Sequence, residues 1–196
     1  MARPREFDEG VVLDAAVQSF WRQGYEATSV RDLIETTGLT GASLYNAFGD
    51  KRSLYQKALA RYVEERIAGR IHRCAGMAPR EALSFFFGDV LRRTLDDEER
   101  KGCMLVNTAL DVAPHDAQLQ EVVDKMLLSI EQFFLARIKE GQADGSFTRA
   151  QSAANLARHL LSTQMGIHVL ARIRPEKALL QGAVESALAM LDAAAS

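Results

Sequence analysis

Residues 36–49 form the stretch of this sequence whose side chains most clearly suggest a chemistry. The stretch carries no formal charge, although 26% of the chain is charged. It offers five residues that can face outward from one short helix: Thr40, Gly41, Ser43, Tyr45 and Asn46. Their hydroxyl, amide and phenol groups can hydrogen-bond base edges, and a helix without carboxylates meets no repulsion from phosphates. We therefore predict a helix that enters a DNA major groove; ordinary surface roles are the competing interpretation for Tyr45 and Asn46.

The residues around this stretch fit a helix-turn-helix over about residues 29–48. Thr28 or Ser29 can cap a first helix, Gly38 supplies the turn, and Thr40 can cap the helix that follows. Ile34 on the first helix belongs to its inward-facing set. The pattern predicts two short helices joined by a tight turn.

Four residues next to the motif are candidates for phosphate contacts. Thr28 and Ser29 lie at a helix N-terminus, where free amides and the helix dipole favour an anion. Lys51 follows the reading helix, and Arg5 lies on the tail before the first helix. In the plainer interpretation Thr28 only caps its helix and Arg5 belongs to a solubilising tail.

The periodicity of apolar residues is helical almost throughout, which predicts an all-α protein of about nine helices. We expect an N-terminal DNA-binding domain at 1–50, a connecting helix at 51–74, and a ligand-binding and dimerisation domain at 75–196. Beyond the motif, the expected helices cover about 8–23, 51–73, 79–95, 103–112, 116–141, 148–173 and a last one from Pro175 through Leu191.

Composition limits the function classes. The net charge is −2, and the first 60 residues carry seven basic and eight acidic side chains, so the placement of charges must matter more than their sum. No apolar run is long enough for a membrane helix, and the N-terminus does not resemble a signal peptide, so we expect a cytoplasmic protein without a membrane partner. The sequence holds no nucleophile–base pair, phosphate loop or metal-ligand cluster, and we predict neither an enzyme nor a cofactor.

The C-terminal half contains aromatic and soft side chains of the kinds that line small-molecule pockets between helices. The candidate ligand-binding residues are Phe86, Cys103, Met104, Asn107, Phe133, Phe134, Met165 and His168. A plain helical core is the competing interpretation for any one of them. His159 and His168 fall on opposite faces of one helix, which argues against a shared metal.

A homodimer is expected because a two-helix DNA reader needs two copies to cover an operator of useful length. The last two helices mix small and large apolar residues, as suits a four-helix seam between symmetry mates. The candidate interface residues are Leu156, Leu160, Thr163, Gly166, Ile167, Leu170, Ala187, Met190 and Leu191.

Several short motifs resemble the N-terminal signature of TetR-family transcriptional regulators. They are Phe20, the segment GYEATSV at 24–30, Gly38–Leu39, Ser43–Leu44–Tyr45, Phe48 and Lys51. The likeness covers about 45 residues; Ile34 and Thr37 depart from it, because the family has smaller residues there, and we expect slightly altered helix packing. It implies an all-α homodimer that binds operator DNA through its N-terminal helices and an inducer through its C-terminal helices.

Cys103 carries a second resemblance. The segment GCMLVN at 102–107 resembles a subgroup of TetR-type regulators, some of which sense electrophiles or oxidants through this cysteine. A thiol at a helix start next to Lys101 can have a lowered pKa, whereas a buried cysteine is often only a small apolar filler. Both roles remain open for Cys103.

We therefore expect a ligand-responsive DNA-binding transcriptional regulator, a repressor that an unknown small-molecule inducer releases from double-stranded operator DNA. The first alternative keeps the fold and makes Cys103 a redox or electrophile sensor. The alternative from another class is a helical small-molecule carrier or an enzyme without DNA binding.

Overall fold

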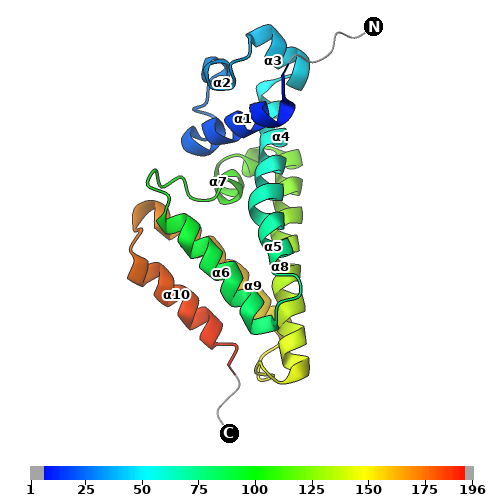
Figure 1. Ribbon diagram of the computed structural model, residues 1–196, viewed down its shortest axis with the longest axis vertical. Helices are drawn as coiled ribbons and strands as arrows, with labels where there is room; N and C mark the ends of the chain where they lie inside the picture. Colours follow the sequence, from blue (N-terminus) through cyan, green and yellow to red (C-terminus); the bar gives the residue numbers. More distant parts are fainter. Residues whose placement is uncertain (1–6, 193–196) are drawn as a thin grey trace.

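A computed structural model describes residues 7–192, and these residues form an all-α protein (Figure 1). The elements are α1 (Glu9–Gln23), α2 (Val30–Thr37), α3 (Gly41–Phe48), α4 (Lys51–Val63), the π-helical turn η1 (Glu64–Ala68), α5 (Gly69–Arg73), α6 (Pro79–Leu95), α7 (Met104–Asp111), the 3-10 turn η2 (Ala113–His115), α8 (Ala117–Asp144), α9 (Ala153–Ile173) and α10 (Lys177–Ala189). Because α4, η1 and α5 run on without a break, the described residues form nine rods, which confirms the expected fold class. Within these residues no helix has the length and apolar character needed to cross a membrane.

Capping residues set the helix boundaries in the N-terminal part. The Asp8 side chain accepts the amide of Gly10 at 2.8 Å, and Gly24 ends α1 with a φ of 83°. Asp50 in the same way accepts the amide of Ser53 at 2.7 Å and begins α4. These boundaries follow the sequence-based expectation.

The start of α9 differs from the expectation. Thr148 does not cap it; Ser152 does, by accepting the amide of Asn155 at 3.2 Å. The preceding residues form a separate loop. Two hydrogen bonds fix it: the Phe147 amide donates to the Gly141 carbonyl at the end of α8, and the Thr148 amide donates to the Leu191 carbonyl after α10. Phe147 is buried, so tertiary packing keeps this loop out of the helix.

The buried apolar side chains form one cluster, which has two parts. Helices α1 to α4 enclose the first, and its central side chains are Val12, Phe20, Leu33, Leu44, Phe48 and Leu54. The second lies between α6, α8, α9 and α10, and its central side chains are Phe86, Phe87, Phe134, Leu160 and Leu180. In Figure 1, α2 and α3 stand at one end of the molecule and α10 lies toward the other. We call helices α1 to α3 the head.

The long rod formed by α4, η1 and α5 keeps one buried side along its length. Its buried residues include Leu59, Val63, Ile67, Arg70 and Cys74, which are three or four positions apart, as on one face of a helix. The π-helical turn η1 adds one residue to this rod without interrupting the buried side.

Gly141 offers a test of packing at the end of α8. A Cβ added at Gly141 would lie 2.2 Å from Cδ2 of the buried Phe147, whereas one added at Gly88 in α6 would meet no atom within 4 Å. We expect Gly141→Ala to lower the free energy of unfolding by about 2 kcal/mol. Gly88→Ala should raise it by up to about 1 kcal/mol, because alanine favours the helix. Urea denaturation measures both; equal stability of the two variants would contradict the packing described.

Candidate nucleic-acid interface

Helix α3 presents an uncharged polar surface to solvent. Leu44 and Phe48 are buried, while Tyr45 is 48% exposed and Asn46 is also exposed. The phenol and amide of these two residues therefore point away from the head core, as required for contacts with DNA. Whether they make such contacts stays a prediction.

The first turn of α3 uses its hydroxyl groups locally. Thr40 Oγ1 accepts the Ser43 amide at 3.2 Å and donates to Ser43 Oγ at 3.0 Å. A Cβ on Gly41 would lie 3.3 Å from Ile34 Cδ1, so the residue without a side chain accommodates the bulkier Ile34 on α2. Gly41 thus helps α2 and α3 pack closely.

The N-terminus of α2 is less open to a phosphate than predicted. Ser29 accepts the amide of Asp32, and the Asp32 carboxylate in turn accepts the Ser29 amide and hydroxyl, both at 2.7 Å. These hydrogen bonds from Ser29 lower the pKa of Asp32. The anion at this helix end is therefore the protein's own carboxylate.

Thr28 requires a correction. Its side chain is fully buried, and its hydroxyl donates to the Gly24 carbonyl at 2.6 Å. The residue holds the turn between α1 and α2 instead of capping α2, and its side chain cannot touch DNA. Local sequence could not separate it from Ser29, because both residue types are good caps.

Lys51 joins the start of α4 to the turn after α1. Its Nζ donates to the Glu26 carbonyl at 3.3 Å and lies 4.5 Å from the centre of the Tyr25 ring. The partly exposed amine is thus held beside the head. Arg5, the other basic candidate, lies outside the described residues.

The head is attached to the rest of the protein at the loop before α7. Trp21 Nε1 donates to the Gly102 carbonyl at 3.0 Å, over a separation of 81 residues. Two cations lie near the indole ring, with Arg66 Cζ 5.3 Å and Lys101 Nζ 5.1 Å from its centre. Beside it Arg22 pairs with Glu99 at 2.7 Å. We call this set of contacts the Trp21 contact.

Two side chains of α4 make further connections, one to the start of α8 and one to α7. Arg52 forms two hydrogen bonds with the Asp116 carboxylate, at 2.5 and 2.8 Å, which, with the Leu119 amide, lower the pKa of Asp116 to about 2. The hydroxyls of Tyr55 and Thr108 lie 2.8 Å apart and are buried. A movement of α7 or of the start of α8 therefore reaches α4 directly.

Cys103 lies next to the Trp21 contact. Its side chain is buried, and its Sγ accepts a hydrogen bond from the Tyr62 hydroxyl at 3.6 Å. Burial, and after it Cys103, raises the pKa of Tyr62 well above its usual value. Reactive thiols are usually accessible, so this environment favours the packing role, while sensing by Cys103 stays a hypothesis.

Three of the predicted ligand-binding residues pack against one another. Phe86 and Phe134 are fully buried with ring centres 5.0 Å apart, and Phe133 lies 5.4 Å from Phe86. Met104 and Cys103 are also buried. In this structure these side chains fill the core, as the competing interpretation proposed; Met165 is partly buried beside them.

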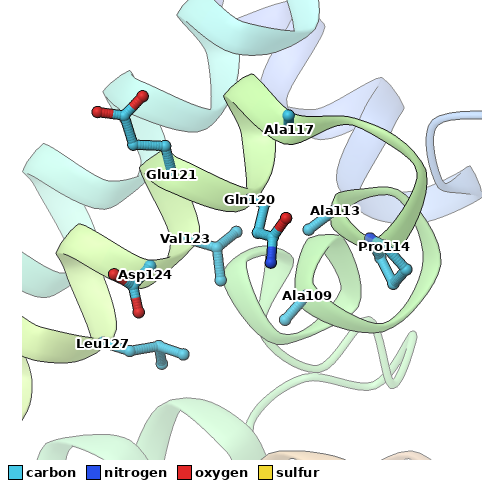
Figure 2. A pocket seen from close by; sticks show the side chains of 9 residues that line it. All are labelled: Ala109, Ala113, Pro114, Ala117, Gln120, Glu121, Val123, Asp124 and Leu127. Carbon is cyan, nitrogen blue, oxygen red and sulfur yellow. The ribbon is translucent and has the colours of Figure 1, made fainter.

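Two described pockets lie against α7. A pocket of about 610 Å³ lies between α7, η2 and α8. Figure 2 shows Ala109, Gln120, Val123 and Leu127 around it. A pocket of about 320 Å³ lies between α7 and α9, and two predicted ligand-binding residues, Asn107 and His168, line it.

The predicted dimer residues divide into two groups. Three are buried within the protomer's own core and do not line the groove between α9 and α10, which corrects their assignment to the interface: Leu156, Leu160 and Leu191. The other six line this surface groove, which has a volume of about 320 Å³: Thr163, Gly166, Ile167, Leu170, Ala187 and Met190. Spacing alone could not distinguish the inner from the outer apolar stripe of these helices.

Asp89 is a buried charge that the sequence did not reveal. Burial alone would raise its pKa, but hydrogen bonds from Arg70, Arg92 and Arg93 outweigh burial and hold the pKa well below its usual value. Arg70 Nε lies 2.8 Å from the carboxylate and is itself buried. This cluster attaches α5 to α6.

The His168 imidazole predicts a pH dependence of stability. Burial, and to a lesser extent Arg70, lower its pKa from 6.5 to about 4, so the folded protein holds it neutral while the unfolded chain becomes protonated. Stability should therefore fall as the pH drops below 6.5, by at most about 1.4 kcal/mol per pH unit. His168→Gln should flatten this slope between about pH 5 and 7, measured by urea denaturation. The other three histidines, His72, His115 and His159, are exposed, and an unchanged slope would contradict the assignment.

Comparison with known protein families covers both parts of the chain. Residues 12–58 match the family model described as "Bacterial regulatory proteins, tetR family", and residues 79–187 match "Tetracyclin repressor-like, C-terminal domain". The chain is 32% identical to the HTH-type transcriptional regulator YezE of Bacillus subtilis (strain 168), over 98% of this chain and 100% of that protein. It is 27% identical to the HTH-type transcriptional repressor ComR of Escherichia coli (strain K12), over 87% of this chain and 82% of ComR.

The fold also matches a solved structure of the regulator CifR. A cysteine mutant of CifR in complex with double-stranded operator DNA superposes with a TM-score of 0.83 at 30% identity, covering 95% of this chain and 98% of that chain. Together with the exposed, uncharged α3, these matches establish that the chain belongs to the TetR family of DNA-binding bacterial transcriptional regulators.

Proposed function

We propose that this protein is a cytoplasmic, homodimeric transcriptional repressor that leaves its operator when a small molecule binds the helical core. The observation that carries the proposal is the uncharged outer surface of α3 with Tyr45 and Asn46 exposed, on a head attached to the core at the Trp21 contact. The names of two relatives support it: ComR is called a repressor, and CifR has been solved with operator DNA.

Two heads must reach successive major grooves, about 34–36 Å apart, for both to bind one operator. A ligand can release the DNA only if it binds better to the form in which the heads do not fit this spacing. The Trp21 contact, Arg52–Asp116 and Tyr55–Thr108 are the connections through which the core would move each head.

Gel-shift measurements with the DNA upstream of the protein's own gene test this function. We expect binding that prefers this DNA over a scrambled fragment at moderate salt. Lack of preference, with or without candidate ligands, would favour the carrier without DNA binding.

Tyr45 and Lys51 should affect DNA binding differently. Tyr45→Ala removes an exposed side chain of α3 and should weaken binding to the operator more than to scrambled DNA, by about 1–3 kcal/mol if the ring contacts a base. Lys51→Ala removes a charge and should weaken both, reducing the slope of log affinity against log salt by about one. Fluorescence anisotropy at several salt concentrations separates the two; identical behaviour of the variants would refute these roles.

The dimer seam should follow the surface groove between α9 and α10. A Cβ at Gly166 meets no atom within 4 Å, so Gly166→Glu leaves the protomer intact while placing a charge in the seam. We expect this variant to be monomeric by light scattering and to lose operator binding, with unchanged helix content by circular dichroism. Gly88→Glu on the exposed side of α6 is the matched control and should stay dimeric. A dimeric Gly166→Glu protein would place the interface elsewhere.

A further inference from the structure

The pocket between α7 and α9 has apolar walls at the molecular surface. Val106 and Leu110 come from α7, and Val169 and Ile173 come from α9. Leu110 is 60% exposed and Ile173 is 77% exposed, so the walls offer apolar area to a ligand from solution.

The polar groups of this pocket include a cation without an anionic partner. Arg172 donates from Nη1 to Asn107 Oδ1 at 3.1 Å, and no carboxylate within residues 7–192 pairs with its guanidinium. His168, which also lines the pocket, is only 8% exposed, and its Nδ1 has no hydrogen-bond partner among the described residues. Buried polar atoms are nearly always satisfied, so the His168 Nδ1 atom indicates that a ligand with polar atoms completes the site, and the exposed guanidinium of Arg172 at the same pocket can pair with an anion.

We propose that this pocket binds a small organic acid, whose carboxylate pairs with Arg172 and whose hydrocarbon or aryl part lies between Val106, Leu110 and Ile173. Charge complementarity selects the acid over an amine, and the apolar walls select it over a small inorganic anion. The inference rests on the proposed function and specifies it, because it names the chemical class and the site of the inducer.

The same side chains hold the loop to which the head is attached. The stem of Arg172 lies against Gly102, since a Cβ built on Gly102 would be 3.0 Å from Arg172 Cδ. Asn107 Nδ2 donates to the Lys101 carbonyl at 2.9 Å, and the Gly102 carbonyl accepts Trp21 Nε1. A carboxylate that pairs with Arg172 would draw on the guanidinium that also holds Asn107 Oδ1, so we expect its arrival to shift both supports of the loop and thereby the Trp21 contact.

Trp21 is the only tryptophan of the chain, so its fluorescence reports on this contact without a label. Benzoate and hexanoate serve as probes, with benzamide and hexanamide as uncharged controls of similar shape. We expect the acids, and not the amides, to change the Trp21 emission of the intact dimer in a saturable way and to release operator DNA over the same concentration range. Calorimetry measures the binding itself.

Arg172→Gln keeps much of the stem against Gly102 and removes the charge. It should weaken binding of the acids about tenfold or more, as expected for a lost charge-assisted hydrogen bond. Arg174→Gln is the matched control: Arg174 lies two residues further on, pairs with Glu176 and does not line the pocket, so its loss should leave acid binding unchanged.

Four results would overturn the inference: no binding of either acid at millimolar concentration, equal binding of acids and amides, equal acid binding by Arg172→Gln and wild type, or acid binding without a change at Trp21. Binding of the acids only to the monomeric Gly166→Glu variant would assign the pocket to the interface between copies and overturn it too. Operator binding by the ligand-free protein keeps the two proposals apart. If the ligand-free protein binds the operator but the acids do not bind the pocket, only this inference is refuted. If the ligand-free protein does not bind the operator, the proposed function is refuted.

Discussion

The indole N–H of Trp21 needs a hydrogen-bond acceptor in a half-buried position, and the acceptor it has is the Gly102 carbonyl. This requirement constrains the loop before α7, since Gly102 adopts a φ of 71° and the stem of Arg172 fills the space beside it. Only glycine meets both conditions. The loop in turn places the start of α7 and the Asn107 side chain, which reaches both the Lys101 carbonyl and Arg172 on α9. The head, α7 and α9 are therefore located by one set of contacts.

Acidic residues at the starts of the N-terminal helices have local roles that the net charge does not show. Asp8, Asp32 and Asp50 each accept a backbone amide at the start of a helix, where the helix dipole favours a negative charge. Their carboxylates are directed at amides of α1, α2 and α4, whereas α3 has no acidic residue. This arrangement reconciles a net charge of −2 with a surface suited to DNA.

Local signals in the sequence were sufficient for most of the fold and for the outer surface of α3. Caps such as Asp8 and Asp50 act within one turn of chain, and the positions of Leu44 and Phe48 follow from helical spacing. Properties that depend on distant contacts were not predictable. The sequence does not reveal that the aromatic side chains around Phe86 pack as core instead of lining a ligand pocket. It also does not reveal that Leu160 faces the protomer's own core. The Trp21 contact joins residues 81 positions apart and has no local signal at all.

The π-helical turn η1 has a consequence for the coupling between the head and the rest of the protein. It adds one residue to a rod whose first part packs on the head and whose last part packs on α6. Each residue of an α-helix turns the chain by about 100°, so removing one residue from the turn would rotate the head relative to the core by about that angle. The rod would remain helical, but Trp21–Gly102, Arg52–Asp116 and Tyr55–Thr108 would all be broken by such a rotation. A single-codon deletion here would thus uncouple the head from α7 and α8 in one step, without altering any residue of α3.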